Sequence, residues 1–187
     1  GETLSKVTNW EDRATCVLFG DGVGAAVVEE SNDDSGIVSI YLGGDGNMSN
    51  LLYQPAGGSR IPATEESVKN KLHTIHMEGN EVYKHAVNAM AEAAKRALEM
   101  AGMTGEDITY FIPHQANIRI IETTAKFVNV PMEKVFVNID RTANTSAGTI
   151  PTALDEMNRK GMLKKGDIIL IDAFGAGFSW GAAVIRW

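Results

Sequence analysis

The chain has 187 residues, of which 44% are hydrophobic, and a net charge of −7. This apolar content suffices for a core of ordinary size, while the acidic balance and the lack of a Lys/Arg-rich block argue against a nucleic-acid partner. No apolar run approaches the ~20 residues that span a bilayer, and a single cysteine excludes an internal disulfide, so we expect a globular, cytoplasmic protein without a membrane segment.

The first 36 residues contain a predicted β-hairpin. Two apolar runs, residues 14–19 and 24–30, flank a Gly-Asp-Gly turn at 20–22, which is a strong hairpin signal. The glycines also resemble a phosphate-binding loop, but such a loop needs a helix directly after it, and a β-like run follows here. Cys16 lies inside the first run, where a thiol is usually buried, so we expect it to be structural rather than reactive.

The rest of the chain predicts alternating strands and helices. Apolar, β-rich runs predict strands at 37–42, 108–112, 135–139, 168–174 and 178–187. Helices are predicted at 80–102, capped by Asn80 and ended by Gly102; at 117–127, with Ile118, Ile121 and Ala125 inward; and at 146–160, capped by Ser146. We expect an α/β layered fold in which the last four strands share one sheet. Residues 43–66 form a long connection that is either a lid or binding loop, or disordered.

Two polar side chains follow predicted strands and form the proposed chemical centre. His114 comes after the strand at 108–112, and Asn144 comes after the strand at 135–139. Ligands of α/β sheets bind beyond the carboxyl ends of the strands, so both residues could donate hydrogen bonds to one carbonyl or enolate oxygen. The alternative is that His114 is an ordinary loop residue and that Asn144 belongs to a turn that caps the next helix.

Three sequence blocks decide between these interpretations: PHQANIRI at 113–120, NTSAGTIP at 144–151 and DAFGAGFSWGAAVIRW at 172–187. They resemble, in order, the signature blocks of the β-ketoacyl-acyl-carrier-protein synthase III family. The resemblance implies a thiolase-like layered fold, α-β-α-β-α in the complete enzyme. Residues 1–36 would end its first half, and residues 37–187 would form its second half. The family's nucleophilic cysteine lies in the first half, in a segment that this chain does not match, so the chain alone is not expected to form the acyl-enzyme.

The resemblance also implies an activity. The family joins a short acyl-CoA primer, such as acetyl-CoA, to malonyl-acyl carrier protein with loss of carbon dioxide, which starts fatty-acid synthesis. His114 and Asn144 match the pair that holds the malonyl thioester oxygen, and the backbone N–H of Ala176 matches a second oxyanion donor. Ala143 and Ala176 stand where the family commonly has glycine. The alternatives are a polyketide-starting enzyme and a non-catalytic module for dimerisation or carrier docking.

Binding residues follow from the same resemblance. The positions that match carrier-protein contacts are Lys84, Gln115, Ala116, Asn117, Ile118, Arg119 and Lys126. The positions that match contacts to CoA or the phosphopantetheine arm are Gly79, Tyr83 and Asn117. We expect acyl carrier protein, acyl-CoA, the rest of the enzyme and a second copy of it as partners, with neither metal nor bound cofactor. A helix directly after His114 is expected to keep its imidazole neutral through the helix dipole.

Overall fold

The computed structural model describes all 187 residues and is built on a four-stranded sheet. In spatial order its strands are β3 (Gly36–Gly44), β8 (Ser179–Arg186), β7 (Ile168–Gly175) and β6 (Tyr110–Pro113). β6 and β7 are parallel, and the other two pairs are antiparallel. The predicted strands at 37–42, 108–112, 168–174 and 178–187 are confirmed, and the first of them joins the same sheet.

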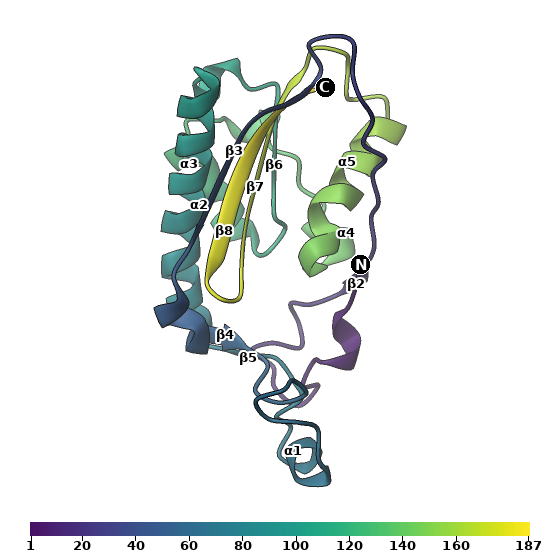
Figure 1. The fold of residues 1–187 in the computed structure, drawn as a ribbon, viewed down its shortest axis with the longest axis vertical. Helices are drawn as coiled ribbons and strands as arrows, with labels where there is room; N and C mark the ends of the chain where they lie inside the picture. The colour runs from purple at the N-terminus through teal and green to yellow at the C-terminus, as the bar shows by residue number, and fades with distance from the viewer.

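Helices cover both faces of this sheet (Figure 1). α2 (Gly79–Ala101) and α3 (Ile118–Phe127) lie on one face, and α5 (Thr149–Arg159) lies on the other. α2 presents a stripe of small buried side chains to β7 and β8, and these form the main core with Phe111 and Leu170. Alanine combines high helix propensity with close approach, so a long helix can lie flat on the sheet.

The helices α2 and α3 test local predictions about their ends and their buried faces. Gly102 ends α2 in the left-handed conformation, as expected, but the residue before the helix is Glu78, without a side-chain cap. Asn80 therefore lies in the first turn, and its predicted capping role is wrong. Asn117 caps α3 by accepting a hydrogen bond from the N–H of Arg119. Ile118 at the start of α3 is 40% exposed, so its predicted inward position is wrong, whereas Ile121 is fully buried.

The predicted strand at 135–139 is wrong in extent. Only a single bridge joins Val135 to Phe111, with a 2.9 Å bond from the N–H of Phe136 to the Phe111 carbonyl. The chain then turns into the short helix α4 (Ile139–Thr142), so the ladder cannot continue. Ser146 does not cap α5 but opens a 3₁₀ turn, Ser146–Gly148, that precedes it. The remaining 3₁₀ turns are Leu4–Lys6, Gly46–Leu51, Gly105–Asp107 and Met132–Lys134.

The predicted N-terminal hairpin is also wrong. Residues 14–18 form turns, Phe19 makes a single bridge to Asn144, and Asp21–Gly22 (β2) pairs with Glu2–Thr3 (β1). Residues 23–35 belong to neither a helix nor a strand, and Val28 in this stretch is 89% exposed. An apolar run forms a strand only where another strand offers its edge, and the turn glycines are used here in a different pairing.

The long connection before α2 forms a projecting arm (Figure 1). Its base is a small pairing of β4 (Leu52–Tyr53) with β5 (His76–Met77), and its tip carries α1 (Glu65–Lys69). Thr64 and Ser67 form a capping box that starts α1. None of the helices is both long and apolar enough to cross a membrane.

Candidate active site

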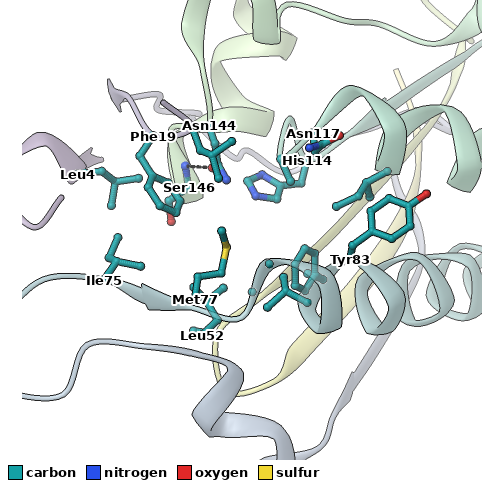
Figure 2. Close-up of a pocket in the computed structure, with 18 of the residues that line it drawn as sticks. Leu4, Phe19, Leu52, Ile75, Met77, Tyr83, His114, Asn117, Asn144 and Ser146 are labelled. Atoms are coloured by element: carbon teal, nitrogen blue, oxygen red, sulfur yellow. Dashed lines mark hydrogen bonds between the residues drawn. The ribbon is translucent and has the colours of Figure 1, made fainter. Parts of the chain in front are cut away.

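A cavity of about 870 Å³ opens beyond the carboxyl ends of β6 and β7. Figure 2 shows it enclosed by the starts of α2 and α3, by the β4–β5 pairing and by the N-terminal segment. His114 and Asn144 both line this cavity, together with Ala176. The structure therefore brings the proposed oxyanion donors to one space.

His114 is held at the end of β6 by the sheet itself. Its backbone N–H donates to the Asp172 carbonyl of β7 at 2.7 Å, and its side chain is buried. Burial lowers the pKa of the imidazole from its usual 6.5 to about 4, so His114 is neutral at physiological pH and can donate one N–H. The predicted neutrality is supported, but its predicted cause is wrong: α3 begins only at Ile118, and desolvation accounts for the shift.

Asn144 is held by contacts that are distant in the sequence. Its N–H donates to the Leu18 carbonyl, and its own carbonyl accepts from the N–H of Gly20, both at 2.9 Å. The side-chain oxygen accepts from the N–H of Ser146 at 2.9 Å (Figure 2). Because a backbone N–H can only donate, this bond fixes which end of the amide is oxygen and leaves the NH₂ group available.

Two alanines, Ala143 and Ala176, occupy positions where the resemblance leads one to expect glycine, and their backbone φ angles differ. Ala143 has φ +57° and ψ −167°, a conformation that only glycine adopts without strain. In the turn between β7 and β8 the positive φ belongs to Gly177, not to Ala176. Ala176 therefore lines the cavity without the strain that alanine would suffer at positive φ.

Several of the predicted binding residues also line the cavity, namely Gly79, Tyr83, Ala116, Asn117 and Arg119. Tyr83 spans α2 and α3 through a 3.3 Å contact between its hydroxyl and that of Thr123. The first residues of α2 and α3 therefore lie at the same cavity as His114.

Other predicted contacts lie elsewhere. Ile118, Lys84 and Lys126 are exposed on the helices outside the cavity, and Lys84 pairs with Glu81 at 2.6 Å. Gln115 has no exposed surface, so its predicted contact with a carrier protein is wrong. All hydrogen-bonding groups of the Gln115 side chain are bonded within this chain, so none is left to bond to a partner protein. Cys16 is half-buried and does not line the cavity, in agreement with a non-catalytic thiol.

The apolar lining was not predicted from the sequence. It comes from side chains of separate short segments: Leu4, Leu18, Phe19, Leu52, Ile75, Met77 and Phe174. Most of these residues lie in stretches without helical or strand periodicity. Only their apolar character was visible in the sequence, and it did not reveal that they face one space.

Two family matches cover most of the chain. Residues 98–187 match the family described as 3-oxoacyl-[acyl-carrier-protein (ACP)] synthase III C terminal, and residues 1–46 match 3-oxoacyl-[acyl-carrier-protein (ACP)] synthase III. A beta-ketoacyl-[acyl-carrier-protein] synthase III from Caldanaerobacter subterraneus subsp. tengcongensis is 56% identical, and one from Clostridioides difficile is 52% identical. Each comparison covers 100% of this chain and 56% of the relative, so the chain spans little more than half the relatives' length.

Solved structures agree with this assignment. The 3-oxoacyl-[acyl-carrier-protein] synthase III of Aquifex aeolicus superposes with a TM-score of 0.84 at 41% identity, over 98% of this chain and 55% of that one. A priming β-ketosynthase of a polyketide pathway superposes with a TM-score of 0.85 at 34% identity, over 98% of this chain and 54% of that one. The fold and the cavity thus define a thiolase-like α/β protein. The chain belongs to the 3-oxoacyl-[acyl-carrier-protein] synthase III family.

Proposed function

We propose that this chain supplies the decarboxylating half of a condensing enzyme that starts fatty-acid synthesis. The enzyme joins a short acyl-CoA primer to malonyl-acyl carrier protein and releases 3-oxoacyl-acyl carrier protein, carbon dioxide and CoA. One observation carries the proposal: a buried, neutral His114 and an Asn144 with an available NH₂ group line the same cavity.

The chemistry needs a site for negative charge on a thioester oxygen. When the malonyl group loses carbon dioxide, the electron pair of the breaking C–C bond forms an enolate. The N–H of His114 and the NH₂ of Asn144 donate hydrogen bonds to the enolate oxygen and stabilise its negative charge. Neither donor transfers its proton, so a neutral imidazole can fill the role of His114. The enolate carbon then attacks the primer's thioester carbonyl, and the thiolate leaves.

The second oxyanion forms on the primer carbonyl during this attack. Ala176 lines the same cavity, and by resemblance its backbone N–H is the proposed donor for it. By resemblance, the cysteine that carries the primer belongs to the part of the relatives that this chain does not span. Acylation and decarboxylation therefore depend on different parts of the enzyme, and variants of this chain can separate them.

Replacement of either donor tests the proposal in the full-length enzyme that carries this chain. We expect His114→Ala and Asn144→Ala each to lower kcat for malonyl-thioester decarboxylation by ~10²- to 10³-fold, the usual loss for one oxyanion donor. Acylation by acyl-CoA should change far less. Asn88→Ala, an exposed change on α2, is the control. A variant that keeps full decarboxylation would remove that residue from the mechanism.

The carrier protein is proposed to dock beside the cavity on the exposed start of α3. Arg119 lies at the cavity and is exposed, and Lys126 is exposed two turns further along the same helix. Carrier proteins are acidic, and this chain is acidic overall, so a local basic face has to overcome a general repulsion. Lys84 adds less than its charge suggests, because Glu81 is paired with it.

A charge reversal tests this docking face. Arg119→Glu should raise KM for malonyl-acyl carrier protein by roughly tenfold while raising KM for malonyl-CoA much less, and added salt should weaken the wild type with the same selectivity. Arg96→Glu, on the far half of α2, is the matched control. Equal effects on the two substrates would mean that Arg119 serves the arm rather than the carrier.

A polyketide-priming enzyme is the second candidate, supported by the similarity to the priming β-ketosynthase. The two functions share the chemistry of His114 and Asn144 and differ in the primer. Initial rates with a series of acyl-CoA primers separate them: a preference for acetyl-CoA supports fatty-acid initiation, and a preference for longer or branched primers supports the alternative. The third alternative, a non-catalytic module for dimerisation or carrier docking, would not decarboxylate malonyl thioesters.

Assembly in the cytoplasm as a homodimer completes the proposal. Large apolar side chains are exposed on the N-terminal segment and on the edge strand β3: Val17, Val23, Val27, Val28, Ile37 and Leu42. Exposed apolar side chains of this kind are typical of an interface, and by resemblance part of this surface would pack against the rest of the enzyme when that part is present. We expect the 187-residue chain to self-associate in sedimentation experiments. A well-folded monomer at high concentration would contradict this part of the proposal.

A further inference from the structure

Gln115, the neighbour of His114, is fully buried and uses its whole side-chain amide. The NH₂ group donates to the carbonyls of Pro113 and Phe136 at 2.9 and 3.1 Å. The oxygen accepts from the N–H groups of Asn138 and Ile139 at 3.0 and 3.2 Å. An amide has two donors and two acceptor sites, so each of its hydrogen-bonding positions is filled.

The four partners belong to two segments that lead to the two oxyanion donors. Pro113 is the last residue of β6 and directly precedes His114. Asn138 and Ile139 open α4, whose end delivers the chain to Asn144. One side chain therefore joins the base of the His114 segment to the base of the Asn144 segment.

Backbone pairing does not provide this connection. The ladder between β6 and the segment after it consists of one bridge, at Phe111 and Val135, and the chain leaves the sheet directly afterwards. In this segment the Phe136 carbonyl and the N–H groups of Asn138 and Ile139 find their partner in Gln115, and without it they would lose these hydrogen bonds. Gln115 takes the place of the missing strand continuation.

We propose that Gln115 is a positioning residue that sets the distance and angle between the His114 imidazole and the Asn144 amide. The proposal rests on the proposed function, because it concerns the same oxyanion site. Gln115 itself does not line the cavity and does not touch the substrate. It acts by holding two donors that must meet one oxygen atom, and a misplacement of about 1 Å can cost ~10²-fold in rate.

Two substitutions of Gln115 in the full-length enzyme test the proposal. Gln115→Leu keeps the approximate size and removes all four bonds, so kcat for malonyl-thioester decarboxylation should fall by ~10²-fold with KM within about twofold of the wild type. Gln115→Glu can accept from both N–H groups but donates to a carbonyl only when it is protonated. Its defect should therefore shrink as the pH falls from 8 to 5.5, a range in which wild-type His114 stays neutral.

Leu98→Ala is the matched control for lost stability. Leu98 is buried near the far end of α2, roughly 28 Å along the helix from Gly79, and its truncation also destabilises the core. The control should lower the melting temperature and leave kcat within about twofold. If Gln115→Leu lowers kcat no more than this control, or if the Gln115→Glu defect is the same at every pH, the positioning role is overturned.

A spectroscopic measurement separates this proposal from the proposed function. The ring resonances of His114 and the side-chain amide resonances of Asn144 should both move in Gln115→Leu and should stay in place in Leu98→Ala. If the wild type fails to decarboxylate malonyl thioesters while these resonances move in Gln115→Leu, the proposed function is wrong and the positioning role of Gln115 is supported. If the resonances do not move, the positioning role is wrong, whether or not the enzyme decarboxylates malonyl thioesters.

Discussion

The two walls of the cavity hold His114 and Asn144, the two proposed donors, by different means. His114 stands at the end of β6, an edge strand of the four-stranded sheet that pairs with β7 and has the α2 and α3 core behind it. Asn144 stands on a wall of turns, held by two backbone bonds to residues 18 and 20 and preceded by a strained Ala143. The sheet wall derives its rigidity from buried apolar area, whereas the turn wall depends on a few hydrogen bonds and on tolerated strain.

The largest expected effect lies in the core of the sheet wall. Phe111 is fully buried on β6, and Phe111→Ala should lower the free energy of unfolding by ~3–5 kcal/mol through lost transfer energy and a new cavity. Val28→Ala is the control, because Val28 is 89% exposed and should change the free energy by less than ~0.5 kcal/mol. Urea titration measures both. Equal losses would show that residues 23–35 contribute to the folded core.

The next largest effect is a pH dependence of the free energy of unfolding that comes from the imidazole of His114. Its pKa is lowered from 6.5 to about 4 by burial, so the unfolded chain binds a proton that the folded chain does not. The stability contribution is fully present above pH 6.5 and is lost as the pH falls from there towards 4. Between pH 7 and 5 the free energy of unfolding should fall by about 2 kcal/mol from this group.

The variant His114→Gln isolates that contribution, because glutamine does not titrate. Urea titrations at pH 7 and 5 should show a smaller difference for the variant than for the wild type. Asp172 acts with the opposite sign, since burial raises the pKa of its carboxyl and the contribution of that group falls as the pH rises above 3.8. Asp172 is present in both proteins, so it cancels in the comparison. An identical pH dependence in the two would refute the buried neutral imidazole.

The smallest effect concerns strain in the turn wall. Ala143→Gly should raise the free energy of unfolding by about 1 kcal/mol, because glycine adopts the φ +57° conformation without a Cβ clash. Ala101→Gly in the last turn of α2 is the matched control and should lower it by about 0.5–1 kcal/mol. If both changes destabilise the chain, Ala143 is not strained, and the turn wall does not differ from the sheet wall in this respect.

The sequence alone determined the elements whose pattern is local. α2 and the strands at 37–42, 108–112, 168–174 and 178–187 follow from periodicity and from stop signals such as Gly102, because one buried face imposes its period on the residues. The position of His114 directly after a strand was predicted for the same reason. The resemblance of the blocks around His114 and Asn144 added the proposed oxyanion role, which spacing alone could not assign.

Only the tertiary structure decided the rest. The apolar run at 14–19 has the composition of a strand, but Phe19 meets Asn144 across the fold instead of a neighbouring strand. From the sequence, Gln115 was predicted to contact the carrier protein beside His114. In the structure its four hydrogen bonds reach residues that are up to 24 positions away. Pairing partners and burial depend on which segments meet after folding, and a side chain's role follows from the groups that remain unpaired around it.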